Sequence, residues 1–402
     1  MKTLQAPTVR KVAMMVSGAL LVAFTGLPHV WSVFLPTVMA ETGWSHDAAR
    51  LCFYLALGLF VPGNILGGRW QDRASPRRVI AAGGGLFVVS LLLCALPPRL
   101  PFFYLSYGLL QGLGSGMVYI AVVTQAQKCF PGRSGFASGI IVAANGISGL
   151  FWAPFCRVLL VQYGMRFTFL MLAALLFAAW LLATACASPS QAAVPEAQGS
   201  HTGRPYRAAE MLRSPTFYLL AASMMLGLVA YMTVSPISQQ LLVDRGVPAG
   251  TAVVAVMAGA VANALARLLV PGLGDRLGRA RCLVLNLLVG AASASLLTFG
   301  GGALSMLAVA LAYFSYGGVL GSFPSLTSEA FGMKHAGENY GYMLCGLAAA
   351  TVLVPMGAAL PLAQEGLFAL GALASIGAAL LMLLYMRTQR KAAGALWCAL
   401  VK

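Results

Sequence analysis

The chain has 402 residues, of which 59% are hydrophobic and only 9% are charged. So little polar surface cannot cover a soluble globule of this length, which excludes a soluble protein and places the chain in a lipid bilayer. The formal net charge of +16 suits either nucleic acid or the cytoplasmic face of a membrane, so the positions of the basic residues decide between the two.

Long apolar segments separated by short polar ones run through the chain. A transmembrane helix needs about 20 mostly apolar residues, and this length allows about twelve helices with their loops. The predicted spans are 12–38, 48–68, 79–97, 102–126, 136–160, 167–187, 216–240, 251–273, 282–299, 304–327, 340–362 and 367–386.

The basic residues are distributed unevenly about these spans. With the amino terminus in the cytoplasm, four lie outside (Arg50, Arg99, Arg166, Arg245), two lie within spans (Arg157, Arg267), and the rest of the 26 are cytoplasmic. This asymmetry predicts a multi-pass protein of the plasma (inner) membrane with both termini in the cytoplasm, in contact with anionic lipid and not with nucleic acid. The apolar run after Lys11 is about twice as long as that of a signal peptide, so we expect a retained first helix.

The first span carries His29, with Pro28 and Trp31 beside it. Histidine titrates near neutral pH, so His29 can donate a hydrogen bond to a carboxylate or carry a coupled proton. A histidine that only packs against its neighbours is the alternative, and Trp31 is interpreted as a packing residue.

Two charged boxes lie half a chain apart, after the second and the eighth spans. The first box, residues 71–78, has the charged members Asp72, Arg73, Arg77 and Arg78. The second, residues 274–281, has Asp275, Arg276, Arg279 and Arg281. A box that recurs at half length indicates an internal duplication. We therefore predict an all-α membrane protein with twelve transmembrane helices in two pseudo-symmetric six-helix halves. The halves are 1–187 and 216–386, joined by a cytoplasmic linker, 188–215, and followed by a cytoplasmic tail, 387–402.

The fourth span carries Gly108, Gly112 and Gly116 at every fourth position, with Gly114 between them. Small residues at this spacing let another helix backbone approach closely. No strand precedes them, so we interpret them as helix-packing residues and not as a nucleotide-binding loop.

Arg267 lies inside the eighth span, eight residues before Asp275. At 1.5 Å per residue it is roughly 12 Å deeper in the membrane than the second box. All ten acidic residues fall in loops or at span ends, and a lone arginine in the hydrocarbon core costs about 3 kcal/mol. A bound anion would explain Arg267, and pairing with helix carbonyls is the alternative. Arg157, near the outer end of the fifth span, is expected to reach the membrane interface instead.

The first box resembles the cytoplasmic signature of the major facilitator superfamily, with matching residues at Gly68, Asp72, Arg73, Arg77 and Arg78. In that family the box ties the cytoplasmic helix ends together in one conformation and releases them in the other, which implies a gating role for both boxes. The aspartate can cap the dipole of the next span while arginines pair with the neighbouring helix. For the arginines, a topology anchor is the alternative.

Three further tracts narrow the resemblance: residues 210–215 before the seventh span, Phe323-Pro324 in the tenth, and Asn339-Tyr340-Gly341 at the start of the eleventh. Together they resemble the oxalate/formate antiporter family, whose neighbours include monocarboxylate porters. That resemblance implies that Arg267 faces the substrate, while Leu347 stands where the oxalate exchangers have a second basic residue, a lysine. One positive charge suits a monoanion, so the resemblance favours a monocarboxylate over oxalate.

The same resemblance places Tyr119, Asn145 and Tyr316 at positions that the exchangers fill with aromatic residues near the substrate. The phenols of Tyr119 and Tyr316 can donate hydrogen bonds to a small carboxylate, with core packing as the alternative. Asn145 departs from the family in residue type.

We therefore expect a secondary active transporter of a pyruvate-, lactate- or formate-type monocarboxylate, working by alternating-access exchange or proton-coupled symport. The alternatives are an oxalate/formate-type dicarboxylate exchanger, a proton-linked drug or metabolite exporter of the same fold, and a non-transporting sensor. The sequence shows no catalytic motif, phosphate loop or metal-ligand spacing, so neither enzyme activity nor a cofactor or metal is expected. The expected partners are the carboxylate, membrane lipids and protons, and the chain is expected to act as a monomer.

Overall fold

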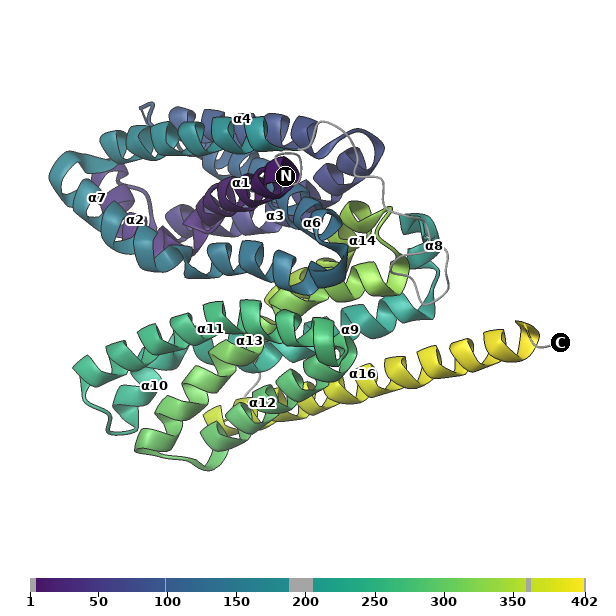
Figure 1. Ribbon diagram of the computed structural model, residues 1–402. Coiled ribbons are helices and arrows are strands. Elements are labelled where there is room, and N and C mark those ends of the chain that lie inside the picture. Colours follow the sequence, from purple (N-terminus) through teal and green to yellow (C-terminus); the bar gives the residue numbers. More distant parts are fainter. Residues whose placement is uncertain (1–4, 98, 188–204, 359–362, 401–402) are drawn as a thin grey trace. The chain divides into compact units, whose positions relative to one another are not determined.

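Helices make up all the regular structure in the described part of the chain (Figure 1). The structure is a computed structural model that describes residues 5–97, 99–187, 205–358 and 363–400, without the side chains of some of them, His29 among these. The elements are α1 (Gln5–Phe24), η1 (Leu27–Val30), α2 (Trp31–Thr42), α3 (His46–Arg73), α4 (Pro76–Cys94), α5 (Leu100–Phe103), η2 (Tyr104–Leu110), α6 (Gln111–Cys129), η3 (Pro131–Arg133), α7 (Ser134–Cys186), α8 (Ala208–Leu212), α9 (Pro215–Val234), η4 (Ser235–Ile237), α10 (Ser238–Asp244), α11 (Ala249–Leu277), α12 (Arg279–Phe299), α13 (Gly302–Phe331), α14 (Ala336–Met343), α15 (Cys345–Ala358) and α16 (Gln364–Leu400).

Nine helical segments of the described residues are long and apolar enough to cross a membrane. One of them, Pro131–Cys186, covers two predicted spans, because Gly164 inside α7 has a positive φ of 75° and turns the chain between residues 136–160 and 167–187. The first and the eleventh predicted spans are each divided into two helices, α1 with α2 and α14 with α15, and are not among the nine. The all-α membrane fold is confirmed, and the helices are consistent with twelve spans.

The first helix of each predicted half is interrupted by a 3-10 turn that contains a proline. Pro28 lies in η1 between α1 and α2, and Pro236 lies in η4 between α9 and α10. Proline has no N–H to donate, so the hydrogen-bond ladder of a helix is broken there. The two breaks stand at equivalent places of the two predicted halves, which agrees with a duplicated chain.

Serine–proline pairs begin two of the helices. Ser75 accepts the N–H of Arg78 on its side chain at 3.4 Å, and Pro76 is the first residue of α4. Ser214 caps α9 in the same way ahead of Pro215. A capping serine followed by proline is a favourable start for a helix, because proline occupies a position whose N–H has no partner within the helix. Ser75 therefore determines where the helix after the first box begins.

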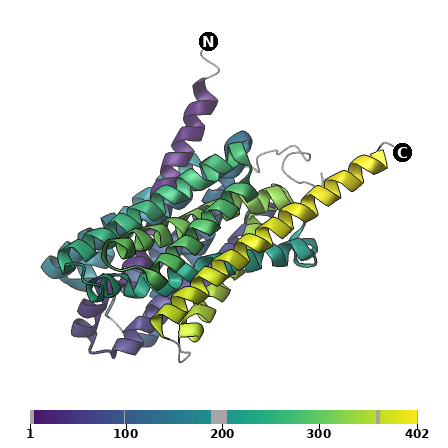
Figure 2. The same ribbon diagram turned by 90° about the horizontal axis from the view of Figure 1, so that it is seen from below.

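Contacts divide the chain into two compact units. Unit 1 comprises Met1–Pro131, Ala144–Val194 and His335–Tyr342, and unit 2 comprises Gly132–Ala143, Pro195–Lys334 and Met343–Lys402. The first turns of α7 thus belong to unit 2, and nearly all of α14 belongs to unit 1. In unit 2, α16 is one uninterrupted helix whose last turns extend past the other helices of that unit (Figure 2). The division into halves at residues 188–215 remains a prediction.

The glycines of the fourth span pack α6 against two neighbours within unit 1. A Cβ atom on Gly112 would lie 2.7 Å from the carbonyl oxygen of Ala56 on α3, and one on Gly114 would lie 2.7 Å from that of Gly83 on α4. Both distances are shorter than carbon–oxygen contact allows, so the three backbones meet only because these side chains are absent. The predicted packing role of these glycines is confirmed.

Substitution of Gly112 by alanine is expected to destabilise unit 1 by about 1–3 kcal/mol, because the added methyl group must push α3 and α6 apart. Gly58, a glycine of α3 whose Cβ position has no atom within 4 Å, is the matched control. There alanine is expected to be neutral, or to stabilise the helix by up to about 1 kcal/mol. Thermal unfolding of the two purified variants in detergent measures the difference, and equal stability of both would contradict the packing role.

Candidate functional site

Arg267 is buried on α11 with 5% of its surface exposed. Its Nε–H donates to Oδ1 of Asn263, one turn earlier, at 3.0 Å. Its Nη1–H donates to the carbonyl oxygen of Val142, in the part of α7 that belongs to unit 2, at 3.1 Å. Both acceptors are neutral, so these two bonds orient the guanidinium group without adding a negative charge beside it.

A chain of tyrosines lies next to this arginine. The ring centre of Tyr316, on α13, is 5.8 Å from the guanidinium carbon of Arg267. Tyr231, on α9, stacks on Tyr316 with ring centres 3.9 Å apart, and Tyr313 meets Tyr231 edge to face at 4.8 Å. Cations are attracted to the face of an aromatic ring at such distances. Unit 2 therefore brings together the predicted pair Arg267 and Tyr316, and it adds Tyr231, which the sequence alone does not single out.

The other residues predicted to contact substrate lie in unit 1. Tyr119 is 6% exposed on α6 and packs edge to face against Phe60, with ring centres 5.3 Å apart. Asn145, on α7, donates from Nδ2 to the hydroxyl of Thr25 at 2.9 Å, beside the break in the first helix. The side chain of His29 lies outside the described residues, and its backbone belongs to η1.

Trp31 is a packing residue, as predicted. It is 3% exposed, its ring centre is 4.4 Å from that of Tyr107, and its indole N–H donates to the carbonyl oxygen of Ala49 at 3.0 Å. Leu347 is half-buried on α15, and Arg157 is exposed on α7.

The aspartate of the first box lies in a buried ion pair. Nζ of Lys128, in the last turn of α6, is 3.0 Å from Oδ1 of Asp72, and the side chains are 5% and 1% exposed. The other carboxylate oxygen accepts the backbone N–H of Glu338, in the first turn of α14, at 2.8 Å. Asp72 therefore combines a buried charge pair with a hydrogen bond at a helix N-terminus.

This arrangement differs from the expected one in two ways. The side chain of Lys128 pairs with Asp72, whereas Arg73, Arg77 and Arg78 are exposed. Asp72 bonds to the start of α14 and not to the following helix, α4, which Ser75 caps. Adjacent helical residues point about 100° apart, so Arg73 turns outward when Asp72 points inward, and α6 packs closely enough to supply the partner.

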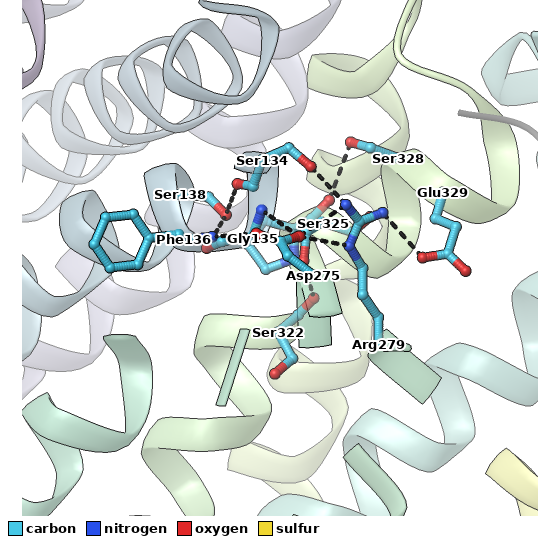
Figure 3. Close-up of polar contacts among 11 residues, drawn as sticks. Ser134, Gly135, Phe136, Ser138, Asp275, Arg279, Ser322, Ser325, Ser328 and Glu329 are labelled. Carbon is cyan, nitrogen blue, oxygen red and sulfur yellow. Dashed lines mark hydrogen bonds and ion pairs between the residues drawn. The ribbon is translucent and has the colours of Figure 1, made fainter. Parts of the chain in front are cut away.

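The second box forms a denser network, within unit 2 (Figure 3). Asp275 accepts the backbone N–H groups of Gly135 and Phe136, in the first turn of α7, at 3.1 and 2.8 Å. Arg279 donates to Asp275 at 2.9 Å and to Glu329, near the end of α13, at 2.9 Å.

Figure 3 shows Arg279 between these two carboxylates, with Ser134 also in contact with the guanidinium group at 2.8 Å. Asp275 thus accepts backbone N–H groups from the start of α7, whereas its bond to the next helix, α12, comes from the side chain of Arg279; Arg276 is exposed. In each unit, the box aspartate accepts N–H groups at the start of a helix from elsewhere in the sequence. The two boxes therefore make equivalent hydrogen bonds, as expected for a duplicated chain.

Unit 2 also contains an apolar cavity of about 140 Å³ between α9, α15 and α16. None of the predicted substrate residues lines it, and its walls suit an acyl chain better than an anion. The lining residues are Met225, Leu226, Val229, Thr233, Ala350, Leu353, Val354, Leu367 and Leu370.

Comparison with known families decides the class of protein. Residues 14–355 match the sequence profile described as the Major Facilitator Superfamily. The chain belongs to this superfamily. It is therefore a multi-pass membrane transporter, and the resemblance of the first box to the superfamily signature is confirmed.

The similar proteins in this superfamily include carriers of carboxylates. The uncharacterized MFS-type transporter YhjX of Escherichia coli K12 is 28% identical over 342 residues, which cover 82% of this chain and 83% of that protein. The oxalate:formate antiporter of Oxalobacter formigenes is 26% identical over 346 residues, covering 83% and 80%. Monocarboxylate transporter 13 of Rattus norvegicus is 29% identical over 152 residues, 37% of this chain and 35% of that protein.

Solved structures of the superfamily share the fold. The transporter FucP in its outward conformation aligns with a TM-score of 0.72 at 14% identity, covering 93% of this chain and 98% of FucP. A bacterial homologue of the iron transporter ferroportin aligns with a TM-score of 0.74 at 17% identity, covering 94% and 99%. At these identities the alignments establish the fold of the transporter.

Several contacts of this transporter are not singled out by its sequence. Asn263 stands one helical turn before Arg267, a spacing at which side chains meet, and this is the signal that points to it. Lys128 follows the fourth predicted span, 102–126, and the sequence alone indicates only one more cytoplasmic charge there. Nothing in the sequence pairs it with Asp72, because that contact depends on how closely α3 and α6 pack.

Proposed function

We propose that this transporter carries small monocarboxylates of the pyruvate, lactate or formate type, with the carboxylate bound to Arg267. The observation that carries the proposal is a buried arginine within a membrane-spanning helix, whose guanidinium group donates to an amide and to a carbonyl oxygen and lies beside the ring of Tyr316. A guanidinium group binds a carboxylate through paired N–H groups. The relatives named for oxalate, formate and monocarboxylates support this substrate class.

The number of charges favours a monoanion. Leu347, on α15, stands at the position for which the family resemblance implies a second basic residue. Arg157 is exposed on α7, and Lys128 already pairs with Asp72. A monocarboxylate bound to Arg267 forms a neutral pair, whereas a dicarboxylate leaves one negative charge in a medium of low dielectric constant, where an unpaired charge is costly.

The proposed cycle is alternating access between the two halves, residues 1–187 and 216–386, with both termini in the cytoplasm. The aspartates Asp72 and Asp275 serve as gates, because each holds the start of a helix through bonds that are broken if that helix moves away. A loaded carrier, in which the charge of Arg267 is neutralised, reorients more readily than an empty one, which favours exchange. His29 is the proposed proton carrier if transport is symport.

Uptake by purified protein in liposomes tests the proposal. The panel consists of labelled pyruvate, lactate, formate, oxalate and a cationic dye, each offered to empty vesicles and to vesicles preloaded with the same compound. We expect uptake of a monocarboxylate, faster into preloaded vesicles. Dye uptake without carboxylate uptake would favour a drug exporter, and absence of carboxylate flux under all conditions would remove the proposal.

A lysine at position 347 is expected to shift preference toward dicarboxylates. Leu347→Lys adds a second positive charge, so the ratio of oxalate to monocarboxylate uptake should rise by about tenfold or more. Leu347→Met, which conserves volume and charge, is the matched control and should keep the wild-type ratio. Competition by unlabelled oxalate against a labelled monocarboxylate measures the shift; an unchanged ratio in Leu347→Lys would show that this position does not face the substrate.

A further inference from the structure

Asn263 is the amide that holds the guanidinium group of Arg267. It lies on the same face of α11, one turn before the arginine, and is 7% exposed. Its Oδ1 accepts the Nε–H of Arg267 at 3.0 Å, so it engages the N–H nearest to the aliphatic stem. This bond limits rotation of the guanidinium plane about its last side-chain torsions, which leaves the plane in a defined direction.

Close packing of α13 on α11 confines this pair. A Cβ atom on Gly317 would lie 2.7 Å from Oδ1 of Asn263, and one on Gly321 would lie 2.6 Å from the carbonyl oxygen of Arg267. From the other side, a Cβ atom on Gly139 of α7 would lie 2.7 Å from that same oxygen. Asn263 and Arg267 thus lie where glycines on two neighbouring helices allow the backbones to meet, and Asn263 has little room for another rotamer.

The chemistry of an amide at this place differs from that of an acid. An aspartate at position 263 would be nearly the same size and would accept the same hydrogen bond, but its charge would pair with Arg267 and compete with a bound anion. An alanine at position 263 would leave the charge of Arg267 unchanged but would no longer orient its guanidinium group. Asparagine supplies an acceptor and no charge, the combination required by a site that orients an arginine toward an anionic ligand.

We infer that Asn263 is a positioning residue for anion recognition: it orients Arg267 toward the substrate carboxylate without itself neutralising the charge of the arginine. The inference rests on the proposed function, because it assigns Asn263 its role at the same site. Two properties of Asn263 matter for this role, its hydrogen-bond acceptor and its lack of charge. Asn263→Ala removes the acceptor, and Asn263→Asp removes the neutrality.

The experiment measures the concentration dependence of monocarboxylate uptake in proteoliposomes for wild type, Asn263→Ala and Asn263→Asp. In Asn263→Ala the arginine loses its orientation, so the KM should rise about tenfold, which is the effect of one hydrogen bond to a charged group. In Asn263→Asp the charge of Arg267 is neutralised, so uptake should fall to that of empty liposomes. Asn286→Ala is the control for loss of a buried amide in the same unit, since Asn286 bonds to the backbone of Ser315 and ties α12 to α13.

A purely structural role would lower the thermal stability of Asn263→Ala and Asn286→Ala alike and leave the KM of the folded protein unchanged in both. A KM increase confined to position 263 therefore supports the inference. If wild type carries a monocarboxylate and Asn263→Ala has the wild-type KM, the inference alone is overturned. Wild-type uptake kinetics in Asn263→Asp would likewise overturn the inference alone. If the wild-type protein carries no carboxylate, the proposed function and this inference are overturned together.

Discussion

Replacement of Arg267 by glutamine is expected to abolish monocarboxylate uptake while the protein still folds and inserts. Glutamine keeps a polar side chain that can donate hydrogen bonds to Asn263 or Val142, but it removes the charge that a carboxylate would pair with. Loss of one partner of a buried charge pair costs about 2–5 kcal/mol, so uptake at low substrate concentration should fall by about 30-fold or more. Arg267→Lys keeps the charge without the paired N–H groups and should retain a small part of the activity.

The matched control is Arg157→Gln, the same substitution at the other basic residue predicted to lie within a span. Arg157 is exposed on α7, so monocarboxylate uptake by Arg157→Gln should stay close to that of wild type. Size-exclusion profiles and thermal unfolding of both variants establish that the protein is folded before uptake is compared. Wild-type uptake by folded Arg267→Gln would remove this arginine from the substrate site.

The close contacts of the helices at glycines are the part of the fold that the sequence predicts best. Pro28 and Pro236 lie in 3-10 turns that interrupt their helices, because proline cannot donate a backbone hydrogen bond. Other prolines, such as Pro271 and Pro324, lie inside helices that continue past them. Gly112 and Gly114 permit close approach because a missing side chain is a property of the residue itself. The close approach at a glycine therefore follows from the residue type, whereas the effect of a proline on its helix also depends on its surroundings.

Partners of charged side chains are harder to predict, and the two boxes show why. Arg279, the first residue of α12, pairs with Asp275 in the last turn of α11, and the two are only four residues apart across the turn at Gly278. The partner of Asp72 is Lys128, 56 residues away, and their contact depends on the packing of α3 on α6. Arginines that follow Asp72 directly in the sequence are exposed, so proximity along the chain predicts the wrong partner there.

The candidate substrate site shows the same division. Arg267 is recognisable from the sequence, because a charge inside a span is rare and costly. The spacing of one helical turn before Arg267 points to Asn263, whereas Tyr231 is an ordinary residue of a membrane helix and becomes conspicuous only when its distance to Tyr316 is known. The sequence therefore predicts the centre of the site, and the helix packing supplies its surroundings.

Replacement of Lys128 by methionine is expected to be strongly destabilising. The substitution leaves the carboxylate of Asp72, whose side chain is 1% exposed, without its cation. Removing one member of a buried ion pair costs about 3–5 kcal/mol, because the remaining carboxylate keeps the N–H of Glu338 but loses the cation of Lys128. Thermal unfolding in detergent measures the loss, and Arg73→Met, at an exposed arginine of the same box, should stay within about 0.5 kcal/mol of wild type.

The double variant Asp72→Asn with Lys128→Met separates the charge effect from simple loss of packing. Asparagine keeps an acceptor for the N–H of Glu338 and removes the buried charge, so the double variant should regain most of the stability that Lys128→Met loses. This non-additivity is the signature of a direct pair, since two independent losses would add. A double variant less stable than Lys128→Met alone would mean that Asp72 is held by α14 and its other neighbours and does not depend on the lysine. Recovery of stability would instead identify the ion pair as the interaction that keeps a charged aspartate at the start of α14, where the proposed gate requires it.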